Sequence, residues 1–518
     1  MSTRRDIATE LSAALRSWTQ RYGERPAVIG EDRALSFTGL DRSADLWTER
    51  LRAAGCGPTA HVGVLAGNSP DWLAAAFGVW RLGATLVPIS TFVSARELRE
   101  ILDDGDVETL IVQPRLRSRD FDSLLAELPA AVRPARIVRL EPVDAGGLTP
   151  RGSSASAAEQ RSTRSGIDPE SIACILYTSG TTGRAKGVML SHRAMLATVV
   201  PTSARSGLTA DDSLLTTLPL FWVAGLVIRA LPTLAAGCAL IVVESFTPEA
   251  VIAALRRHRP SALHLRPPQI GQIFAAAEFE PRLLERVRKG GGRGEWFQPH
   301  LDPKHVRMIT GYGMTETAGY VTALDWQDPL EVRAAQIGRP LPGVELRIVD
   351  PSGQSCPPEV AGEVRVRAPG LFSGYCKQPA GSGFDAEGFF CTGDLGRIDR
   401  GGVFHFIGRS KDLLRVKGIN VSPAEVEAVL GAHPDVEAAY VVGLPPDELE
   451  QEVVALIVSR NDAPLHADAL RDLAARELSH YKRPAHYVHI GRDEVPLSGT
   501  SKPQRAALAA LAAARLAS

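Results

Sequence analysis

The most informative stretch of the sequence is Ile175-Leu-Tyr-Thr-Ser-Gly-Thr-Thr-Gly-Arg-Ala-Lys-Gly-Val-Met-Leu-Ser-His192. Apolar residues over 172–177 predict a buried strand, which leads into small and hydroxylated residues closed by Lys186. Small residues let the backbone approach a phosphate, hydroxyls and amides donate to its oxygens, and lysine neutralises its charge. The spacing is not that of GxxxxGK[ST], and a second short strand follows. The stretch therefore predicts a phosphate-binding loop between two strands.

On both sides of this loop, short apolar runs alternate with helical patterns. The predicted strands lie at 62–65, 85–89, 109–112, 214–218, 239–243 and 262–265. The predicted helices lie at 72–82, 97–102, 226–235 and 248–257. Strands that alternate with helices indicate crossover units and a largely parallel sheet. We therefore expect an α/β protein with two α/β halves within residues 1–330.

The pattern of predicted elements changes further along the chain. Short strands with Gly and Pro turns over 338–407 predict a β-rich subdomain. Ser422-Pro-Ala-Glu425 has the pattern of a capping box with Pro at the first helical position, and Gly431 ends the predicted helix. Strands are expected at 438–442 and 453–458. The polar segment 141–169 is expected to be a surface loop.

Composition narrows the class of protein. The 518 residues are 44% hydrophobic and 23% charged, which is typical of a soluble protein with more than one domain. A formal net charge of -1 argues against a global nucleic-acid binder. The six cysteines are scattered without CxxC pairs, which indicates reduced thiols. With neither a signal-peptide core nor a membrane-spanning run, we expect a cytoplasmic protein.

Further motifs follow the loop in order. They are Gly311-Tyr-Gly-Met-Thr-Glu316, Gly338-Arg-Pro340, Thr392-Gly-Asp394, Gly408-Arg-Ser-Lys-Asp412, Val416-Lys-Gly418 and Pro496-Leu-Ser-Gly-Thr-Ser-Lys502. With Ser36-Phe-Thr38 and Asn68-Ser-Pro70, the set resembles the adenylate-forming (AMP-binding) superfamily, in its acyl-CoA synthetase branch. The resemblance covers nearly the whole chain. It implies a large N-terminal domain, 1–409, of two α/β subdomains plus a β-rich one. A small mobile α+β lid, 410–518, would turn on a hinge near Lys411.

The resemblance also assigns a nucleotide site. The β- and γ-phosphates of ATP are expected against Thr178, Ser179, Gly180, Thr181, Thr182, Gly183 and Lys186. Tyr312 would lie against adenine, and Gly313 would belong to the same nucleotide site. Asp394 would accept both ribose hydroxyls, and Arg409 would reach the ribose and phosphate. Catalytic roles fall to Thr315 at the α-phosphate, Glu316 as the Mg²⁺ ligand, and Lys502, which would bridge the carboxylate and the α-phosphate.

After a rotation of the lid, Lys417 and Gly418 would line a tunnel for the pantetheine of coenzyme A. A solvated surface charge is the alternative for Lys417.

The sequence departs from the family pattern in three places. Ala185 stands where proline is common, and the last motif ends Thr-Ser-Lys instead of Ser-Gly-Lys. The largest departure is Lys289-Gly-Gly-Gly-Arg-Gly-Glu-Trp-Phe-Gln-Pro-His300, which is Gly-rich and poor in helical pattern where the family has Gly-Gly-Ala-Pro and a helix. Gly291 and Gly292 are the candidates for the equivalent backbone beside adenine.

The acyl pocket is expected to draw on Trp222, Val223, Gly225, segment 264–270 with Arg266, and Tyr320. Trp222 stands where the family often has histidine. It would gate the pocket, shape it for a bulky ring, or serve as a plain core aromatic. Arg266 would either pair with a second polar group of the substrate or face solvent, and the second alternative is favoured.

These motifs predict an ATP-dependent acyl-CoA ligase that converts a hydrophobic acid, bulky ones included, to acyl-AMP and then to acyl-CoA. Its partners would be the acid, ATP/AMP, Mg²⁺ and coenzyme A, and a homodimer stays open. One alternative is a ligase that forms only the thioester, from acyl-AMP made by a partner adenylating enzyme. Another is an enzyme that loads a carrier protein in trans. A luciferase-like oxygenase and a non-catalytic nucleotide-binding module have less support.

Overall fold

The computed structural model describes residues 8–142, 166–178, 185–335, 337–409, 413–416, 419–445, 451–460, 467–478, 480–497 and 503–517. These residues form two compact units. The first contains the chain up to Glu345 together with Arg367–Phe384, and the second contains Leu346–Val366 together with the chain from Asp385 onward. A division of the chain between 409 and 410 stays a prediction. Most of the predicted loop 141–169 lies outside the described residues.

A seven-stranded sheet of the first unit contains the strand that leads into the phosphate-binding loop. Its order is β21-β10-β9-β4-β3-β5-β8. The strands are β3 (His61–Leu65), β4 (Thr85–Ile89), β5 (Val107–Val112), β8 (Arg136–Arg139), β9 (Ile172–Thr178), β10 (Lys186–Ser191) and β21 (Gly374–Tyr375). The neighbours from β9 to β8 run parallel, whereas β10 is antiparallel to β9 and β21 to β10. The predicted strands and parallel sheet are confirmed here.

A second seven-stranded sheet has the order β15-β14-β13-β11-β12-β1-β2. Its strands are β1 (Pro26–Ile29), β2 (Ala34–Ser36), β11 (Ser213–Thr216), β12 (Ala239–Val242), β13 (Ala262–His264), β14 (Lys289–Gly291) and β15 (Arg307–Ile309). The N-terminal β1 pairs with β12 in parallel register, Val28 opposite Leu240. The two predicted α/β halves are therefore present but interleaved in sequence, because the first strand of the chain completes the second sheet.

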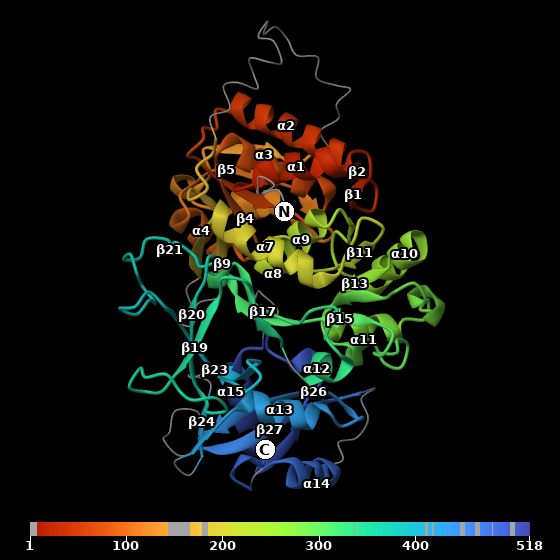
Figure 1. Cartoon of the computed structure of the whole chain (residues 1–518), viewed down its shortest axis with the longest axis vertical. Helices are drawn as coiled ribbons and strands as arrows, with labels where there is room; N and C mark the ends of the chain where they lie inside the picture. The colour runs from red at the N-terminus through yellow and green to blue at the C-terminus, as the bar shows by residue number, and fades with distance from the viewer. Residues whose placement is uncertain are drawn as a thin grey trace, which may run out of the picture. The chain divides into compact units, whose positions relative to one another are not determined.

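Helices cover these sheets with apolar faces. Figure 1 shows α1 (Leu11–Tyr22), α2 (Phe37–Ala53) and α3 (Pro70–Leu82) together, and they pack on one another. Every residue of α3 is buried, and Trp80 Nε1 donates to Ala173 O of β9 at 2.9 Å. This bond fixes the strand that precedes the phosphate-binding loop against the helical layer. The other helices of the unit include α4 (Ala95–Asp104), α5 (Phe121–Ala126), α7 (His192–Ser206), α10 (Pro248–His258), α11 (Pro267–Ala275) and α12 (Leu330–Ala335).

The predicted helix at 226–235 has an irregular start. It begins with α8 (Val223–Gly225), continues as a π-helical turn, η2 (Leu226–Ala230), and ends as α9 (Leu231–Ala235). π-Helical turns inside α-helices occur mostly at functional sites, because the wider turn re-aims side chains. η2 packs on α7 and on β17 (Gly319–Ala323).

The second unit contains the predicted β-rich region. A four-stranded sheet has the order β19 (Glu345–Val349), β20 (Gly362–Arg367), β22 (Phe390–Ile398) and β23 (Phe404–Arg409). A second sheet joins β26 (Val436–Leu444), β27 (Glu452–Ser459) and β28 (His486–His489), and a hairpin joins β24 (Leu414–Val416) to β25 (Ile419–Val421). The helices are α13 (Pro423–Gly431), α14 (Ala467–Glu477) and α15 (Arg505–Ala517).

The capping box expected at Ser422 is wrong. Helix α13 does begin at Pro423 and end at Gly431, but the Ser422 side chain makes no cap hydrogen bond. Its Oγ donates instead to Ile407 O of β23 at 2.6 Å, and Glu425 pairs with Lys482 at 2.7 Å. A tertiary bond between helix and sheet has therefore replaced the local one that the pattern predicted.

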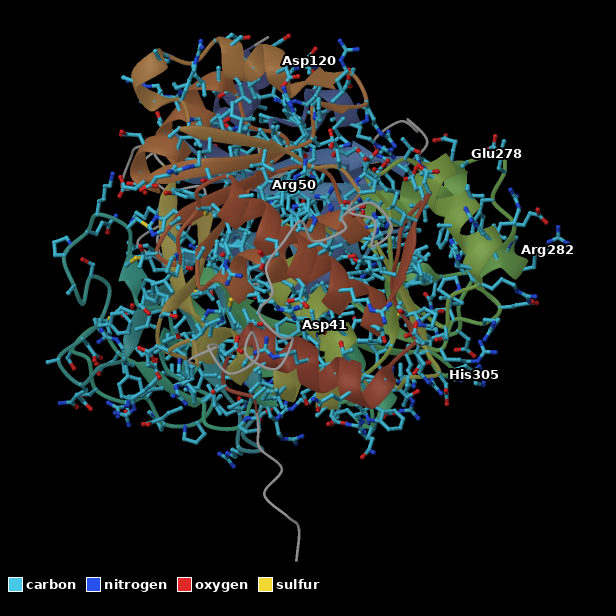
Figure 2. All side chains as sticks on the ribbon, turned by 90° about the horizontal axis from the view of Figure 1, so that it is seen from above. Asp41, Arg50, Asp120, Glu278, Arg282 and His305 are labelled. Atoms are coloured by element: carbon cyan, nitrogen blue, oxygen red, sulfur yellow. The ribbon has the colours of Figure 1, made fainter. Side chains whose placement is uncertain are left out.

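The described residues include neither a membrane-spanning helix nor a disulfide bond. No described helix is long and apolar enough to cross a membrane. All six cysteines lie within the described residues and are unpaired. Figure 2 shows Glu278, Arg282 and His305 projecting outward. The core of this part of the unit, which includes Leu263, Phe297 and Met308, is apolar.

Candidate active site

The β9–β10 hairpin brings the two ends of the phosphate-binding loop together. Thr178 pairs directly with Lys186 in the antiparallel register. The residues between them that were assigned to phosphate binding, Ser179, Gly180, Thr181, Thr182 and Gly183, lie outside the described residues. Lys186 Nζ lies 5.1 Å from the centre of the Tyr375 ring on β21. The hairpin thus brings a hydroxyl and a cation to directly paired positions.

The turn at 311–317 places the predicted catalytic residues. β16 (Gly311–Met314) leads into a 3₁₀ turn, η5 (Thr315–Thr317), and Ala318 then reverses the chain at φ +50. Thr317 Oγ1 accepts from Met314 N at 3.0 Å and so closes the turn. Thr315 and Glu316 are consequently half-exposed on a turn with a fixed backbone. Tyr312 is 7% exposed, whereas Gly313 is exposed.

Glu316 and Lys186 are connected through one tyrosine. The Tyr375 hydroxyl donates to Glu316 Oε1 at 3.0 Å, and the same ring lies under Lys186. Phe372 N also donates to Glu316 O at 2.8 Å, which anchors the turn to the segment that carries Tyr375. The motifs from two distant parts of the sequence therefore meet within one unit. Sequence reasoning missed Tyr375, and no pattern around it signals this contact.

No group of three or more His, Cys, Asp or Glu side chains within the described ranges could hold a metal ion by itself. Glu316 supplies a single hard oxygen ligand. Mg²⁺ is commonly held by one or two carboxylates together with substrate phosphates and water. The half-exposed carboxylate of Glu316 fits that arrangement, in which most of the ligands would come from the nucleotide and solvent.

The ribose-binding residues predicted from sequence meet in the second unit. Asp394 on β22 pairs with Arg409 on β23, and Arg409 Nε lies 3.0 Å from Asp394 Oδ1. Asp394 is only 2% exposed. Thr392 Oγ1 accepts from Asp394 N at 3.0 Å and donates to Val364 O at 2.6 Å. The backbone at Asp394 is thus fixed by the sheet and by Thr392, and its buried carboxylate forms an ion pair with an exposed arginine.

The Gly-rich segment that departs from the family pattern forms strand β14, next to the edge strand β15. A 3₁₀ turn, η4 (Gly294–Phe297), follows it. A short 3₁₀ turn therefore stands where the sequence is poor in helical pattern. A Cβ on Gly291 would lie 2.4 Å from Arg229 Nη2 and 2.5 Å from His264 Nδ1. Gly292 has φ +107. Both positions consequently favour glycine, the first for space and the second for its backbone conformation.

We predict that Gly291→Ala lowers the free energy of unfolding by about 1–3 kcal/mol, because Arg229 or His264 has to move. Denaturant unfolding measures the change. Gly271→Ala is the matched control, since it lies in α11 with nothing within 4 Å of its added Cβ, and it should be neutral or stabilising. Equal unfolding midpoints for Gly291→Ala and the unchanged protein would contradict the prediction.

The residues predicted for the acyl pocket fall into two contacts. Arg266 lies over the Trp222 ring, 5.5 Å from its centre, and Phe221 meets Trp222 edge-on at 5.8 Å. Tyr320 on β17 accepts a hydrogen bond from Arg229 Nη2 at 3.1 Å. The structure places Val223 half-buried and Gly225 buried in α8.

The solvent-facing alternative for Arg266 is wrong. Its Nε is buried, and burial lowers the pKa of the guanidinium. The expectation failed because Arg266 precedes α11 at the end of strand β13, where the chain turns its side chain onto Trp222.

Sequence reasoning also missed Arg229. It is 3% exposed in the π-helical turn η2 and donates from Nε to His264 Nδ1. A signal was available, because Arg229 is the one charged residue of the apolar run 218–243. A charge in such a run is rare unless it is paired or functional.

Four predicted residues of the second unit lie outside the described residues: Lys411, Lys417, Gly418 and Lys502. Their roles as hinge, coenzyme A contacts and catalytic lysine stay predictions.

The chain matches the family model "AMP-binding enzyme" over residues 15–376 and "AMP-binding enzyme C-terminal domain" over 425–502. It is 30% identical to an indoleacetate–CoA ligase of Aromatoleum aromaticum, over 95% of this chain and 96% of that protein.

A second relative is the 3-[(3aS,4S,7aS)-7a-methyl-1,5-dioxo-octahydro-1H-inden-4-yl]propanoyl:CoA ligase of Mycobacterium tuberculosis. That protein is 31% identical, over 96% of this chain and 98% of its own length. Among solved structures, an anthranilate CoA ligase in complex with anthranoyl-AMP superposes with a TM-score of 0.83 at 25% identity, covering 99% of each chain. Ligases of this kind use ATP, Mg²⁺ and coenzyme A. The chain therefore belongs to the AMP-binding enzyme family and is an AMP-forming acid–thiol ligase.

Proposed function

We propose that the protein activates a hydrophobic carboxylic acid, bulky ring systems included, as acyl-AMP and then transfers the acyl group to coenzyme A. The observation that carries the activation step is the Lys186–Tyr375–Glu316 contact series, which gathers a cation and a carboxylate at the end of the β9–β10 hairpin. An aromatic wall of Phe221 and Trp222 supports a bulky acyl group, because flat rings pack well on such surfaces. The relatives named for indoleacetate, an octahydroindenyl propanoate and anthranilate support the same substrate class.

The chemistry follows from the leaving group. A carboxylate oxygen cannot depart when a thiol attacks, whereas AMP can leave from a mixed anhydride. Lys186 and the loop it closes would hold the β- and γ-phosphates, and Thr315 would donate to the α-phosphate. Glu316 would ligate Mg²⁺, which neutralises phosphate charge as the carboxylate oxygen attacks the α-phosphorus and pyrophosphate leaves. Asp394 and Arg409 would orient the ribose.

Acid-dependent ATP–pyrophosphate exchange across aliphatic, aryl and polycyclic acids tests the first step, and acyl-CoA formation tests the second. Exchange and thioester formation with ring-bearing acids are expected. If exchange is absent from folded protein while acyl-AMP supplied with coenzyme A yields acyl-CoA, the thioester-only alternative replaces the proposal. Transfer to a carrier protein without transfer to coenzyme A would favour loading in trans.

A further inference from the structure

Arg229 is a buried cation without a counter-charge. Only 3% of it is exposed, and in the part of the chain that the structure describes its side chain bonds His264 and Tyr320 and no Asp or Glu. Burial lowers the pKa of its guanidinium, and only Tyr320 acts in the opposite direction. An arginine nevertheless stays protonated in a protein. Because an uncompensated buried charge costs several kcal/mol, its retention calls for a ligand or a structural reason.

The contacts of Arg229 are all with neutral groups. Its Nε donates to His264 Nδ1, and its Nη2 donates to the Tyr320 hydroxyl at 3.1 Å. Burial, followed by the Arg229 charge, lowers the pKa of His264 well below its usual value, so this ring is neutral and carries its proton on Nε2. Within the described residues, Arg229 Nη1 has no hydrogen-bond partner.

Two other residues predicted for the acyl pocket also have donors without acceptors. Trp222 Nε1 and Arg266 Nε are both buried without a hydrogen-bond partner among the described residues. Arg266 is two positions beyond His264 in sequence and stacks on Trp222. Buried polar groups are normally satisfied, so donors without an acceptor among the residues predicted for the acyl pocket are matched to an acceptor that arrives from outside.

Accessibility is consistent with a ligand at this place. His264, Tyr320 and Trp222 are each partly exposed, whereas Arg229, which bonds the first two, is buried. Gly291 lies against Arg229 and His264, where a side chain would not fit. The π-helical turn that carries Arg229 is a geometry found mostly at functional sites.

We propose that Arg229, supported by His264 and Tyr320, binds a second anionic group of the acyl substrate, remote from the carboxylate that is activated. The substrate class is therefore a dicarboxylic acid, or an acid with an equivalent remote anion, on an apolar body that packs on Trp222. The inference rests on the proposed function, and it adds the polarity of the acid's far end. A planar guanidinium suits a carboxylate because two parallel N–H bonds can form.

The test compares acids that differ only at the remote end. Two sets are used, one on an aryl and one on an alkyl scaffold, and each ends in a carboxylate, a carboxamide or a methyl group. ATP–pyrophosphate exchange gives kcat/KM for each acid. The unchanged protein is expected to favour the remote carboxylate over the methyl acid by about 100-fold. Arg229→Met is expected to reduce that preference at least about tenfold, whatever happens to the overall rate.

Two further variants separate recognition from structure. Arg229→Lys keeps the charge but not the planar fork, and it is expected to retain part of the preference. Arg333→Met is the matched control, because Arg333 is also buried, at 5% exposure, but donates to Asp328 O and Val306 O. This control is expected to lower stability and leave the preference unchanged. An equal loss of preference in both Met variants would make the role of Arg229 structural and overturn the proposal.

A binding measurement distinguishes failure of this inference from failure of the proposed function. Titration calorimetry with the same acids in the presence of AMP measures binding even when no exchange occurs. Binding of the remote carboxylate that is weakened in Arg229→Met supports this inference although the proposed reaction has failed. Equal binding of the carboxylate and methyl acids, or exchange rates that favour the methyl acid, overturns the inference while leaving the ligase activity in place.

Discussion

Glu316→Gln is expected to lower acid-dependent ATP–pyrophosphate exchange by at least about 100-fold at limiting Mg²⁺. The amide has the same shape and can still accept the Tyr375 hydrogen bond, so the turn at 315–317 is preserved. Only the negative charge is lost, and with it most of the affinity of this position for a divalent cation. The measurement is the exchange rate as a function of Mg²⁺ concentration, in which the half-saturating concentration should rise.

Two variants bracket this effect. Tyr375→Phe removes one hydrogen bond to Glu316 and is expected to cost roughly 3- to 10-fold, because a single such bond contributes about 0.5–1.5 kcal/mol. Glu331→Gln removes an exposed carboxylate from α12 of the same unit and should leave exchange unchanged. A Glu316→Gln protein with an unaltered Mg²⁺ dependence would remove Glu316 from metal binding.

Lys502→Ala is expected to reduce acyl-AMP formation by about 100- to 1000-fold, which is the usual effect of losing one charge-stabilising donor at a reaction centre. The reason is electrostatic. Negative charge accumulates where the carboxylate oxygen meets the α-phosphate, and a lysine between them stabilises it. Thioester formation from supplied acyl-AMP should be nearly unaffected. In acyl-AMP the bond between the carboxylate oxygen and the α-phosphorus has already formed, so this negative charge no longer has to be stabilised. Single-turnover assays of each half-reaction provide the measurement.

The comparison variant for the other half-reaction is Gly418→Leu, which is expected to slow thioester formation and spare adenylation. Lys482→Ala serves as the charge control, because its amine is already engaged by Glu425 at 2.7 Å. A surface pair of this kind contributes little to stability, so activity should persist. Equal damage to both half-reactions in Lys502→Ala and Gly418→Leu would contradict an alternating use of the C-terminal region.

Local pattern was sufficient for most single elements. The strand predicted at 85–89 is β4, the helix predicted at 248–257 is α10, and the strand predicted at 239–243 is β12. In each case the apolar spacing lies within the element, and Gly or Pro residues lie in it or next to it. Nearby residues therefore carry the information.

Pattern failed where a distant partner changed the outcome. Ser422 has the residues of a capping box around it, yet its hydroxyl bonds Ile407 O, fifteen positions earlier. Pro26–Ile29 has no signal that assigns it to the second sheet, where it pairs with β12. Local propensity gives way in such places because one buried tertiary hydrogen bond or strand pair is worth as much as the local alternative.

The sequence by itself determined the class of reaction and the identity of most candidate groups, because ordered motifs such as Thr178–Lys186 and Gly311–Glu316 are contiguous in the chain. Only the tertiary structure decided that Tyr375 joins Lys186 to Glu316, and that Arg266 lies on Trp222 instead of in solvent. The same holds for Arg229. Its burial and the absence of a carboxylate partner among the described residues depend on which distant strands and turns surround it, and no local pattern encodes that surrounding.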